Sequence, residues 1–284
     1  MRKKICIVTG ANSGIGFELA KGMAQKNFVT VLLCRNKKSG EAARNKIINY
    51  TKNNDVYLKI ADLSSQISIR KFAKEYNAQF SHLDVLFNNA GANFFNRQIT
   101  DDSIEMTFAV NYLASFLLTK LLLPKLKKND SGKIILTVGG ISGNTIIQFD
   151  DINFENKYNV IKASSQAILA KLMFCYELSR KLKETNITIN CFHPGATKTD
   201  LQKKMPLIWK ILTGMMRPFF KSAEKAAETG LYLATAEKME NISGKYYKNL
   251  KEAKSSKISY DLEIARQLWD VSENMIKQTG NKIP

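Results

Sequence analysis

The chain has 284 residues, 44% of them hydrophobic, which is enough to bury one sizeable core. Its 43 Lys and Arg residues outnumber its 25 Asp and Glu residues, and the formal net charge is +18 at pH 7. The basic residues are scattered along the whole sequence, which favours a solvated lysine-rich surface over a nucleic-acid partner. We therefore expect no nucleic acid among its partners.

Short apolar runs rich in β-branched residues alternate with segments of helical periodicity from the start of the chain. We expect strands over residues 4–9, 29–34, 56–61, 83–88, 133–138 and 187–192, and a short seventh near residue 244. Near-continuous apolar strands joined by helices are typical of a parallel sheet covered on both faces. The prediction is a single α/β domain over residues 1–284, a Rossmann-type doubly wound sheet of about seven strands. Its ligand crevice should lie at the carboxyl ends of the strands.

Three further segments stand out between these elements. The most apolar stretch, residues 112–126, is interrupted by Lys120, Pro124 and Lys125, so we expect a core helix there rather than a membrane span. Residues 139–158 and 197–222 fall outside the alternation of strands and helices. Connections of this length in a compact domain are usually functional, so both are candidates for the ligand site.

The cysteines and histidines show no metal-ligand or disulfide pattern. The two histidines, His82 and His193, are far apart in the sequence. Each cysteine lies inside an apolar run and none forms a C-x-x-C pair: Cys6, Cys34, Cys175 and Cys191. We expect buried, reduced thiols and no metal. Because the first strand starts almost at the N-terminus, leaving no room for a signal peptide, we expect a cytoplasmic protein.

A glycine-rich turn directly follows the first predicted strand and opens a helical segment. The motif TGANSGIG spans residues 9–16, and its glycines let the backbone turn tightly and approach a pyrophosphate. The helix N-terminus then presents unpaired N–H groups and a positive dipole end to the anion. The residues expected to bind a dinucleotide here are Gly10, Asn12, Ser13, Gly14, Ile15 and Gly16.

The end of the second predicted strand indicates which dinucleotide is bound. A site for a free ribose 2′-hydroxyl favours an acidic residue here, whereas this chain has Arg35 and Asn36, followed by Lys37 and Lys38. A guanidinium suits a 2′-phosphate, so NADP(H) is favoured over NAD(H). The alternative is that Arg35 is an ordinary surface cation.

These and several further motifs resemble the short-chain dehydrogenase/reductase family over nearly the whole chain. TGANSGIG resembles its T-G-x-x-x-G-x-G, NNAG at 88–91 its signature after the fourth strand, and HPGATKT at 193–199 its P-G-x-x-x-T. The segment from Ser243 onward resembles the retinol-dehydrogenase-like branch. The resemblance implies further dinucleotide contacts from Asp62, Leu63, Asn89, Ala90, Gly91, Pro194, Gly195 and Thr199.

The resemblance also identifies four catalytic positions. In the family a tyrosine acts as acid and base during hydride transfer, a following lysine lowers its pKa and holds the nicotinamide ribose, and a serine binds the reacting oxygen. An asparagine, here Asn111, completes this tetrad. The branch pattern Y-x-Q-S-K-L-A-N-L-M-F aligns without gaps on SSQAILAKLMF, residues 164–174. That alignment puts Ser164 at the tyrosine and Ile168 at the lysine, while GKIILTVG puts Gly139 at the serine.

Loss of the family Ser, Tyr and Lys leaves three functions open. The first is an enzyme repurposed for cyclisation, isomerisation, elimination or hydride transfer to an activated C=N or C=C bond. The second is an NADP(H)-binding protein without catalysis. The third is an ordinary carbonyl reductase that uses Tyr158 and Lys162, the Y-x-x-x-K pair in KYNVIK. Asn111 is either a donor to a substrate carbonyl or, as in the family, a residue that kinks its helix.

The segment at about 197–222 resembles the substrate lid of the family. Its run MPLIWKILTGMMRPFF carries Met, Trp and Phe side chains, which favours a lipophilic small-molecule substrate. Basic residues flank this run, so contact with an anionic membrane surface is an alternative interpretation of the same segment. The family also implies a homo-oligomer, by analogy alone.

Overall fold

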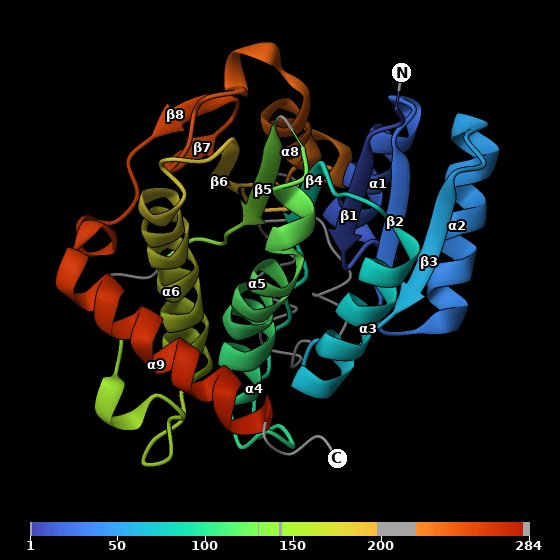
Figure 1. Cartoon of the computed structure of the whole chain (residues 1–284). Helices are drawn as coiled ribbons and strands as arrows, with labels where there is room; N and C mark the ends of the chain where they lie inside the picture. Colours follow the sequence, from blue (N-terminus) through green and yellow to red (C-terminus); the bar gives the residue numbers. More distant parts are fainter. Residues whose placement is uncertain (1, 130, 142–143, 198–219, 281–284) are drawn as a thin grey trace.

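The computed structural model describes residues 2–129, 131–141, 144–197 and 220–280 (Figure 1). Its centre is an eight-stranded sheet in the order β3-β2-β1-β4-β5-β6-β7-β8. Every neighbouring pair is parallel except β7 and β8, which are antiparallel. The strands are β1 (Ile5–Thr9), β2 (Val29–Cys34), β3 (Val56–Ile60), β4 (Val85–Asn88), β5 (Gly132–Thr137), β6 (Ile187–His193), β7 (Lys245–Lys248) and β8 (Lys251–Ala253).

Helices cover both faces of this sheet (Figure 1). The helices that pack on one face are α1 (Gly14–Gln25), α2 (Lys37–Thr51) and α8 (Ala223–Thr235). The helices that pack on the other face are α3 (Gln66–Gln79), α5 (Ala114–Leu126), α6 (Val160–Lys181) and α9 (Leu262–Gly280). The sheet is therefore the middle of three layers, as a doubly wound fold requires.

Alternate residues of the central strand β1 belong to two different cores. Ile5 and Ile7 pack with the α3, α5 and α6 side of the sheet, whereas Cys6 and Val8 pack with α1 and α8. All four side chains are buried. A strand buried on both faces must be apolar at every position, which is why these parallel strands read as continuous apolar runs.

Several short elements connect the main ones. A short helix α4 (Met106–Phe108) leads into a π-helical turn, η1 (Ala109–Leu113), which continues directly into α5. Turns of 3₁₀-helix occur at η2 (Phe149–Asp151), η5 (Glu237–Met239) and η6 (Lys257–Tyr260). A π-helical turn bulges the helix and is frequently found at functional sites.

The predicted α/β architecture is confirmed. The strand positions agree with the predicted runs to within a residue or two, apart from β8, which the sequence analysis did not include. β8 has only three residues, Lys-Glu-Ala, two of them exposed. A strand this short and polar has no alternation or apolar run from which it can be recognised.

The strand order positions a ligand crevice at one end of the sheet. β1 lies between β2 and β4, so the chain must cross β1 after β3 before it adds β4 on the other side. The turn after β1 leads to α1 on one face, whereas the segment after β4 leads to α4 and α5 on the other. Where two neighbouring strands send their connections to opposite faces, a crevice opens at their carboxyl ends.

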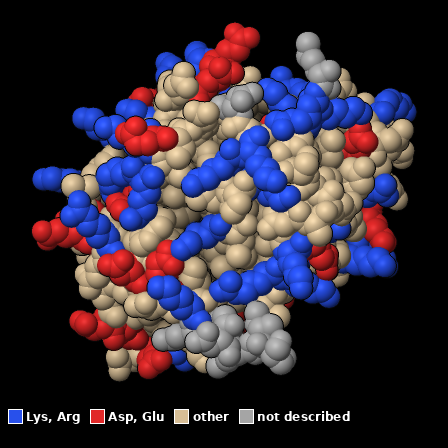
Figure 2. All heavy atoms as spheres, viewed as in Figure 1, with Lys and Arg blue, Asp and Glu red and all other residues tan. Residues whose placement is uncertain are grey.

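On the face shown in Figure 2, the surface charge is distributed rather than gathered in one place. Lys and Arg side chains there outnumber the Asp and Glu side chains that lie between them. Ion pairs within this distribution include Lys120 with Glu273 and Lys225 with Glu228. On this face, the arrangement matches the scattered distribution of basic residues along the sequence.

Candidate active site

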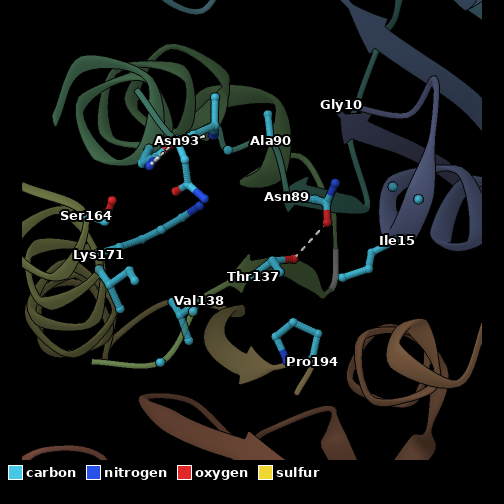
Figure 3. A pocket seen from close by; sticks show the side chains of 18 of the residues that line it. Gly10, Ile15, Asn89, Ala90, Asn93, Thr137, Val138, Ser164, Lys171 and Pro194 are labelled. Carbon is cyan, nitrogen blue, oxygen red and sulfur yellow. Dashed lines mark hydrogen bonds between the residues drawn. The ribbon is translucent and has the colours of Figure 1, made fainter. Parts of the chain in front are cut away.

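A cavity of about 640 Å³ opens at the carboxyl ends of β1, β4 and β5 (Figure 3). The turn after β1 forms one side, and the N-terminal half of α6 forms the opposite side. The segments after β4 and β5 line the space between them, with Pro194 after β6. A pocket of this volume accommodates a small organic ligand or the reactive end of a larger one.

The turn after β1 has the geometry of an anion cradle. Gly10 and Gly14 adopt positive φ angles of 66° and 57°, a region that glycine enters without strain. A Cβ at Gly16 would lie 2.3 Å from the Gly10 carbonyl oxygen, so a side chain there would fill the turn itself. Ser13 caps α1 without a side-chain hydrogen bond, which leaves the first N–H groups of the helix available to an anion.

The segment after β4 is fastened to this cradle by hydrogen bonds. Thr9 Oγ1 accepts the backbone N–H groups of Asn89 and Ala90, both at 2.9 Å. The Asn89 side chain donates to the Thr9 carbonyl oxygen at 3.0 Å and accepts from Thr137 Oγ1 at 3.1 Å. The three strands β1, β4 and β5 are thereby joined at the floor of the cavity. The free N–H groups at the start of α1, beside the glycine turn, suit the pyrophosphate of a dinucleotide.

Asn111 lies in the π-helical turn η1 and is held in place by backbone groups. Its Oδ1 accepts the Ala92 N–H at 2.8 Å, and its Nδ2 donates to the Ala92 carbonyl oxygen at 2.9 Å. Both ends of the amide therefore clamp one residue of the cavity wall. This geometry suits a structural role in the bulged helix better than donation to a substrate.

The helix α6 presents one face to the cavity. Val160, Ser164, Ile168 and Lys171 all line it, at a spacing that places residues on the same side of a helix. Figure 3 shows Ser164 and Lys171 extending from this helix, across the cavity from Gly10 and Ile15. The structure thus places Ser164 and Ile168, the positions aligned with the family tyrosine and lysine, in the cavity wall.

Gly139, the position aligned with the family serine, lines the same wall. A Cβ at Gly139 would lie 2.8 Å from Ile168 Cδ1. A side chain at 139 would therefore require the terminal methyl group of Ile168 to shift. Gly139 and Ile168 are thus neighbours in the cavity wall.

Tyr158 and Lys162 are not brought into the cavity. Tyr158 precedes α6, and its hydroxyl donates to the Phe94 carbonyl oxygen at 2.5 Å and lies 3.3 Å from Thr107 Oγ1. Burial raises the pKa of Tyr158, the opposite of what an activated phenol requires. Lys162 is exposed in the first turn of α6. Neither residue is part of the described lining.

Lys171 is a cavity residue that sequence reasoning missed. Its Nζ donates to the carbonyl oxygen of Asn88, the last residue of β4, at 2.9 Å. The residue is only 3% exposed, and burial lowers the pKa of its amine to about 7. The available signal was the lysine at position 171, where the family pattern K-L-A-N has asparagine; this chain reads I-L-A-K at 168–171.

The residues expected around the adenosine half of a dinucleotide lie at the ends of β2 and β3, outside the described cavity lining. Arg35 is exposed directly after β2, beside the glycine turn, whose Gly10 N–H donates to the Leu33 carbonyl oxygen at 2.9 Å. Asn36 caps α2 by accepting the Ser39 N–H at 2.9 Å. The half-buried Asp62 and Leu63 follow β3, the neighbour of β2.

The motif after β6 is described only in part. Pro194 lines the cavity, and Gly195 has a φ of 85°. Thr199 and most of the proposed lid at 197–222 lie outside the described residues. At the edges of that gap, Thr197 and Lys221 form a parallel bridge, and the Lys221 N–H donates to the Ala196 carbonyl oxygen at 2.9 Å.

Comparison with known proteins gives consistent matches over most of the chain. A family model described as short chain dehydrogenase matches residues 4–207. Retinol dehydrogenase 13 of Mus musculus is 38% identical over 281 residues, which cover 96% of this chain and 84% of that protein. Retinol dehydrogenase 14 of Homo sapiens is 34% identical over 292 residues, which cover 97% and 87%. The crystal structure of an uncharacterized protein from Mycobacterium paratuberculosis has a TM-score of 0.78 at 26% identity, covering 96% and 93%.

The expectation of a cytoplasmic protein is wrong. The relatives matched over nearly the whole chain are named for retinol, an apolar alcohol that partitions into lipid. Among the described residues, the helical segment 106–126 has the length and apolarity to cross a membrane, with a mean hydropathy of 1.5. In this fold it forms α4, η1 and α5, with 67% of the apolar window buried. The prediction failed because the position of the first strand carries no information about whether a folded chain associates with a membrane.

Proposed function

Because the chain belongs to the short-chain dehydrogenase family, we propose that it is an NADP(H)-dependent oxidoreductase repurposed for an already activated, lipophilic acceptor. The acceptor we infer is a C=C or C=N bond rather than an ordinary carbonyl. One observation carries the proposal: the glycine turn after β1 shares its cavity with a wall made by Gly139, Ser164 and Ile168. The cradle supports cofactor binding, and the wall argues against acid-assisted carbonyl reduction.

The residues that would hold the dinucleotide follow the ends of three strands, β1, β4 and β6. The glycine turn and the start of α1 offer N–H groups to its pyrophosphate, and Asn89, Ala90 and Pro194 line the space for its nicotinamide half. A bound nicotinamide dinucleotide supplies a hydride for transfer to carbon. The chain itself contributes the position of the acceptor and the exclusion of water.

We infer a preference for the 2′-phosphorylated dinucleotide from the end of β2. Arg35 is exposed there beside the glycine turn, and Lys37 and Lys38 follow it. Arg35→Ala should therefore weaken NADPH binding by about tenfold, since one charge-assisted contact is worth about 1.5–3 kcal/mol when fully formed. NADH binding should change little. Fluorescence titration of each dinucleotide measures both values, and an equal loss for the two would contradict the assignment.

The α6 wall limits which acceptors can react. Reduction of a simple ketone generates an alkoxide, and losing the positioned acid typically costs about 10²–10⁴ in rate. The Ser164 hydroxyl is a much weaker acid than an activated phenol, and Ile168 carries no charge to activate it. An acceptor that is already electrophilic, or whose negative charge is delocalised after hydride addition, needs less of this help.

The lipophilic character of the substrate is inferred from the cavity wall. Phe95, Val138, Val160 and Ile161 line it with apolar side chains. The relatives named for retinol support an apolar ligand of similar character for this chain. Burial of such a ligand contributes binding free energy at about 25 cal/mol per Å² of apolar surface before the cost of association is subtracted.

The test is a comparison of acceptors with the purified full-length chain and NADPH. We expect oxidation of NADPH with an apolar α,β-unsaturated ketone or a cyclic iminium ion, and little with the matching saturated ketone. Brisk reduction of the saturated ketone would contradict the proposal and favour an ordinary reductase. Tight NADPH binding with no turnover of any acceptor would favour a binding protein without catalysis.

A further inference from the structure

We propose that Lys171 is the proton donor of this cavity and that the substrate is therefore an α,β-unsaturated carbonyl compound reduced at its C=C bond. The inference rests on the proposed function and selects between its two acceptors. Among the described residues that line the cavity, Lys171 is the only one with an ionisable side chain. Reduction of a C=C bond needs a proton, whereas an iminium ion needs none and would be repelled by an ammonium group.

Lys171 lies on the same cavity wall as Ile168, the position aligned with the family lysine. It follows Ile168 by three residues on the same face of α6. Side chains of a helix tilt toward its N-terminus, so a long side chain at 171 covers surface at the level of the preceding turn. Figure 3 shows the Lys171 side chain extending from α6 into the cavity.

The hydrogen bond of Nζ fixes its direction. The amine donates to the Asn88 carbonyl oxygen at 2.9 Å, and Asn88 immediately precedes the cradle residue Asn89. An ammonium group has three N–H donors, and this bond uses one of them. The Asn88 side chain is engaged elsewhere, because its Nδ2 donates to Thr119 Oγ1 at 2.9 Å.

The surroundings of Lys171 contain little opposing charge. In the part of the chain that the structure describes, no carboxylate forms an ion pair with Nζ. The titratable group that acts on it is the Cys191 thiol of β6, which in its ionised form raises the pKa of the amine.

Titratable groups on η1 and α9, two of the elements packed on α6, have partners of their own. The Tyr112 hydroxyl of η1 pairs with Ser272 of α9, and Glu273 of α9 pairs with Lys120 of α5. Burial is thus the dominant influence on Lys171 and lowers the pKa of its amine to about 7. An amine with this pKa is a far better acid near neutrality than an exposed lysine.

The chemical step balances with these groups. A bound reduced dinucleotide would supply a hydride, whose electron pair forms the C–H bond at the β-carbon, and the C=C electrons become those of an enolate. One N–H bond of the Lys171 ammonium breaks, and its proton forms a C–H bond at the α-carbon. The neutral amine regains a proton from solvent after the product leaves. The substrate gains two hydrogens and is reduced, while the dinucleotide is oxidised.

The test compares Lys171→Met with Lys183→Met, which removes an exposed lysine just beyond α6. Lys171→Asn, which restores the residue of the family pattern, is a second variant in case the methionine packs poorly. The first readout needs no substrate. Protein labelled with ¹³C at the lysine ε-carbons is titrated by NMR, and the Lys171 signal is assigned by its loss in the variant. We expect a midpoint near pH 7, whereas a midpoint above pH 9 overturns the proposal.

The second readout is the pH profile of kcat with an apolar α,β-unsaturated ketone. Lys171→Met should lower kcat by about 10²-fold, the scale of a lost general acid, and remove the fall in kcat above neutral pH. NADPH affinity, and all readouts in Lys183→Met, should stay within about twofold of wild type. An unchanged kcat profile in Lys171→Met overturns the proposal even if the amine titrates near pH 7. Turnover of a cyclic iminium ion but not of the ketone overturns it as well.

A failure of the proposed function gives a different pattern. In that case NADPH binds, or fails to bind, and no acceptor is turned over by the wild type. The proton-donor role then falls with the function, whatever the NMR midpoint. A third pattern is that the wild type turns over the ketone while the Lys171 amine titrates above pH 9 or Lys171→Met keeps an unchanged kcat profile. That pattern contradicts only the proton-donor role of Lys171.

Discussion

The two sides of the cavity differ in the parts of the chain from which they are built. The cradle side consists mainly of backbone: a turn with Gly10 and Gly14 at positive φ, and the first N–H groups of α1. The α6 side consists of side chains on one helical face. A side chain on a helix can be exchanged without moving the backbone, whereas a Cβ at Gly16 would collide with the turn. The chemistry of such a site can therefore change while its cofactor binding is retained.

The largest expected effect comes from restoring the family's catalytic residues on the α6 side of the cavity. The triple variant Gly139→Ser, Ser164→Tyr and Ile168→Lys should raise reduction of a saturated ketone by about 10²–10⁴, the typical contribution of a positioned acid. Gly139→Ser alone should not, because it supplies neither the phenol nor the ammonium group. Steady-state oxidation of NADPH by the ketone measures the gain.

The matched control for this gain carries Ser164→Phe in place of Ser164→Tyr. It keeps the ring and the other two substitutions but lacks the hydroxyl. Equal activity of the two triple variants would show that ring packing rather than proton transfer is responsible. No gain in either variant, with NADPH binding intact, would mean that these three substitutions are not sufficient for carbonyl reduction.

The next effect tests the cradle side. Gly16→Ala should weaken dinucleotide binding by at least about tenfold and destabilise the fold by about 1–3 kcal/mol, the usual cost of overpacking. Its Cβ would meet the Gly10 carbonyl oxygen at 2.3 Å and Asn89 Nδ2 at 2.6 Å. Gly140→Ala is the control, since its Cβ would have its nearest neighbour at 3.9 Å in the same cavity. Titration with NADPH and thermal unfolding measure both effects, and equal behaviour of the two variants would contradict this account of the cradle.

A third effect concerns the stability cost of a buried lysine. The pKa of a lysine amine is ordinarily 10.5, as in the unfolded chain, and burial lowers it to about 7 in folded Lys171. Between these values the unfolded chain binds more protons than the folded one, so stability rises with pH. Lys171→Met should therefore stabilise the protein most below pH 7, by up to about 5 kcal/mol, and this gain should vanish toward pH 10.5.

Chemical denaturation of wild type, Lys171→Met and Lys183→Met across this pH range measures the difference. Lys183 is exposed, so its variant should track the wild type at every pH. A gain in Lys171→Met that is constant with pH would show that packing, rather than desolvation of the charge, is responsible.

The cradle was predictable from sequence because its geometry is encoded in residue types. Glycines at 10, 14 and 16 follow an apolar run and precede a helical period; Gly10 and Gly14 have positive φ angles, and a Cβ at Gly16 would collide with the turn. The sheet was predictable for a related reason, since strands buried on both faces must be apolar throughout. β8 was missed because three residues with two exposed side chains carry no such pattern.

The α6 side of the cavity was predictable only in part. Alignment identified Gly139, Ser164 and Ile168, but nothing in the sequence showed that Gly139 and Ile168 are neighbours in the cavity wall. Lys171 was missed because lysines are common in this chain, and only the fold shows which of them is buried. Its recognition requires knowledge of which face of α6 lines the cavity.

The smallest expected effect tests Tyr158, which, like Lys162, is not part of the described cavity lining. Tyr158→Phe should lower the free energy of unfolding by about 1 kcal/mol, because it removes the hydrogen bond to the Phe94 carbonyl oxygen. It should leave turnover of any acceptor within about twofold, since the hydroxyl lies outside the described cavity lining. Chemical denaturation and steady-state kinetics provide the two measurements. A loss of turnover of about 10²-fold or more would make Tyr158 the acid and would place the proton chemistry on the segment before α6 rather than on its cavity face.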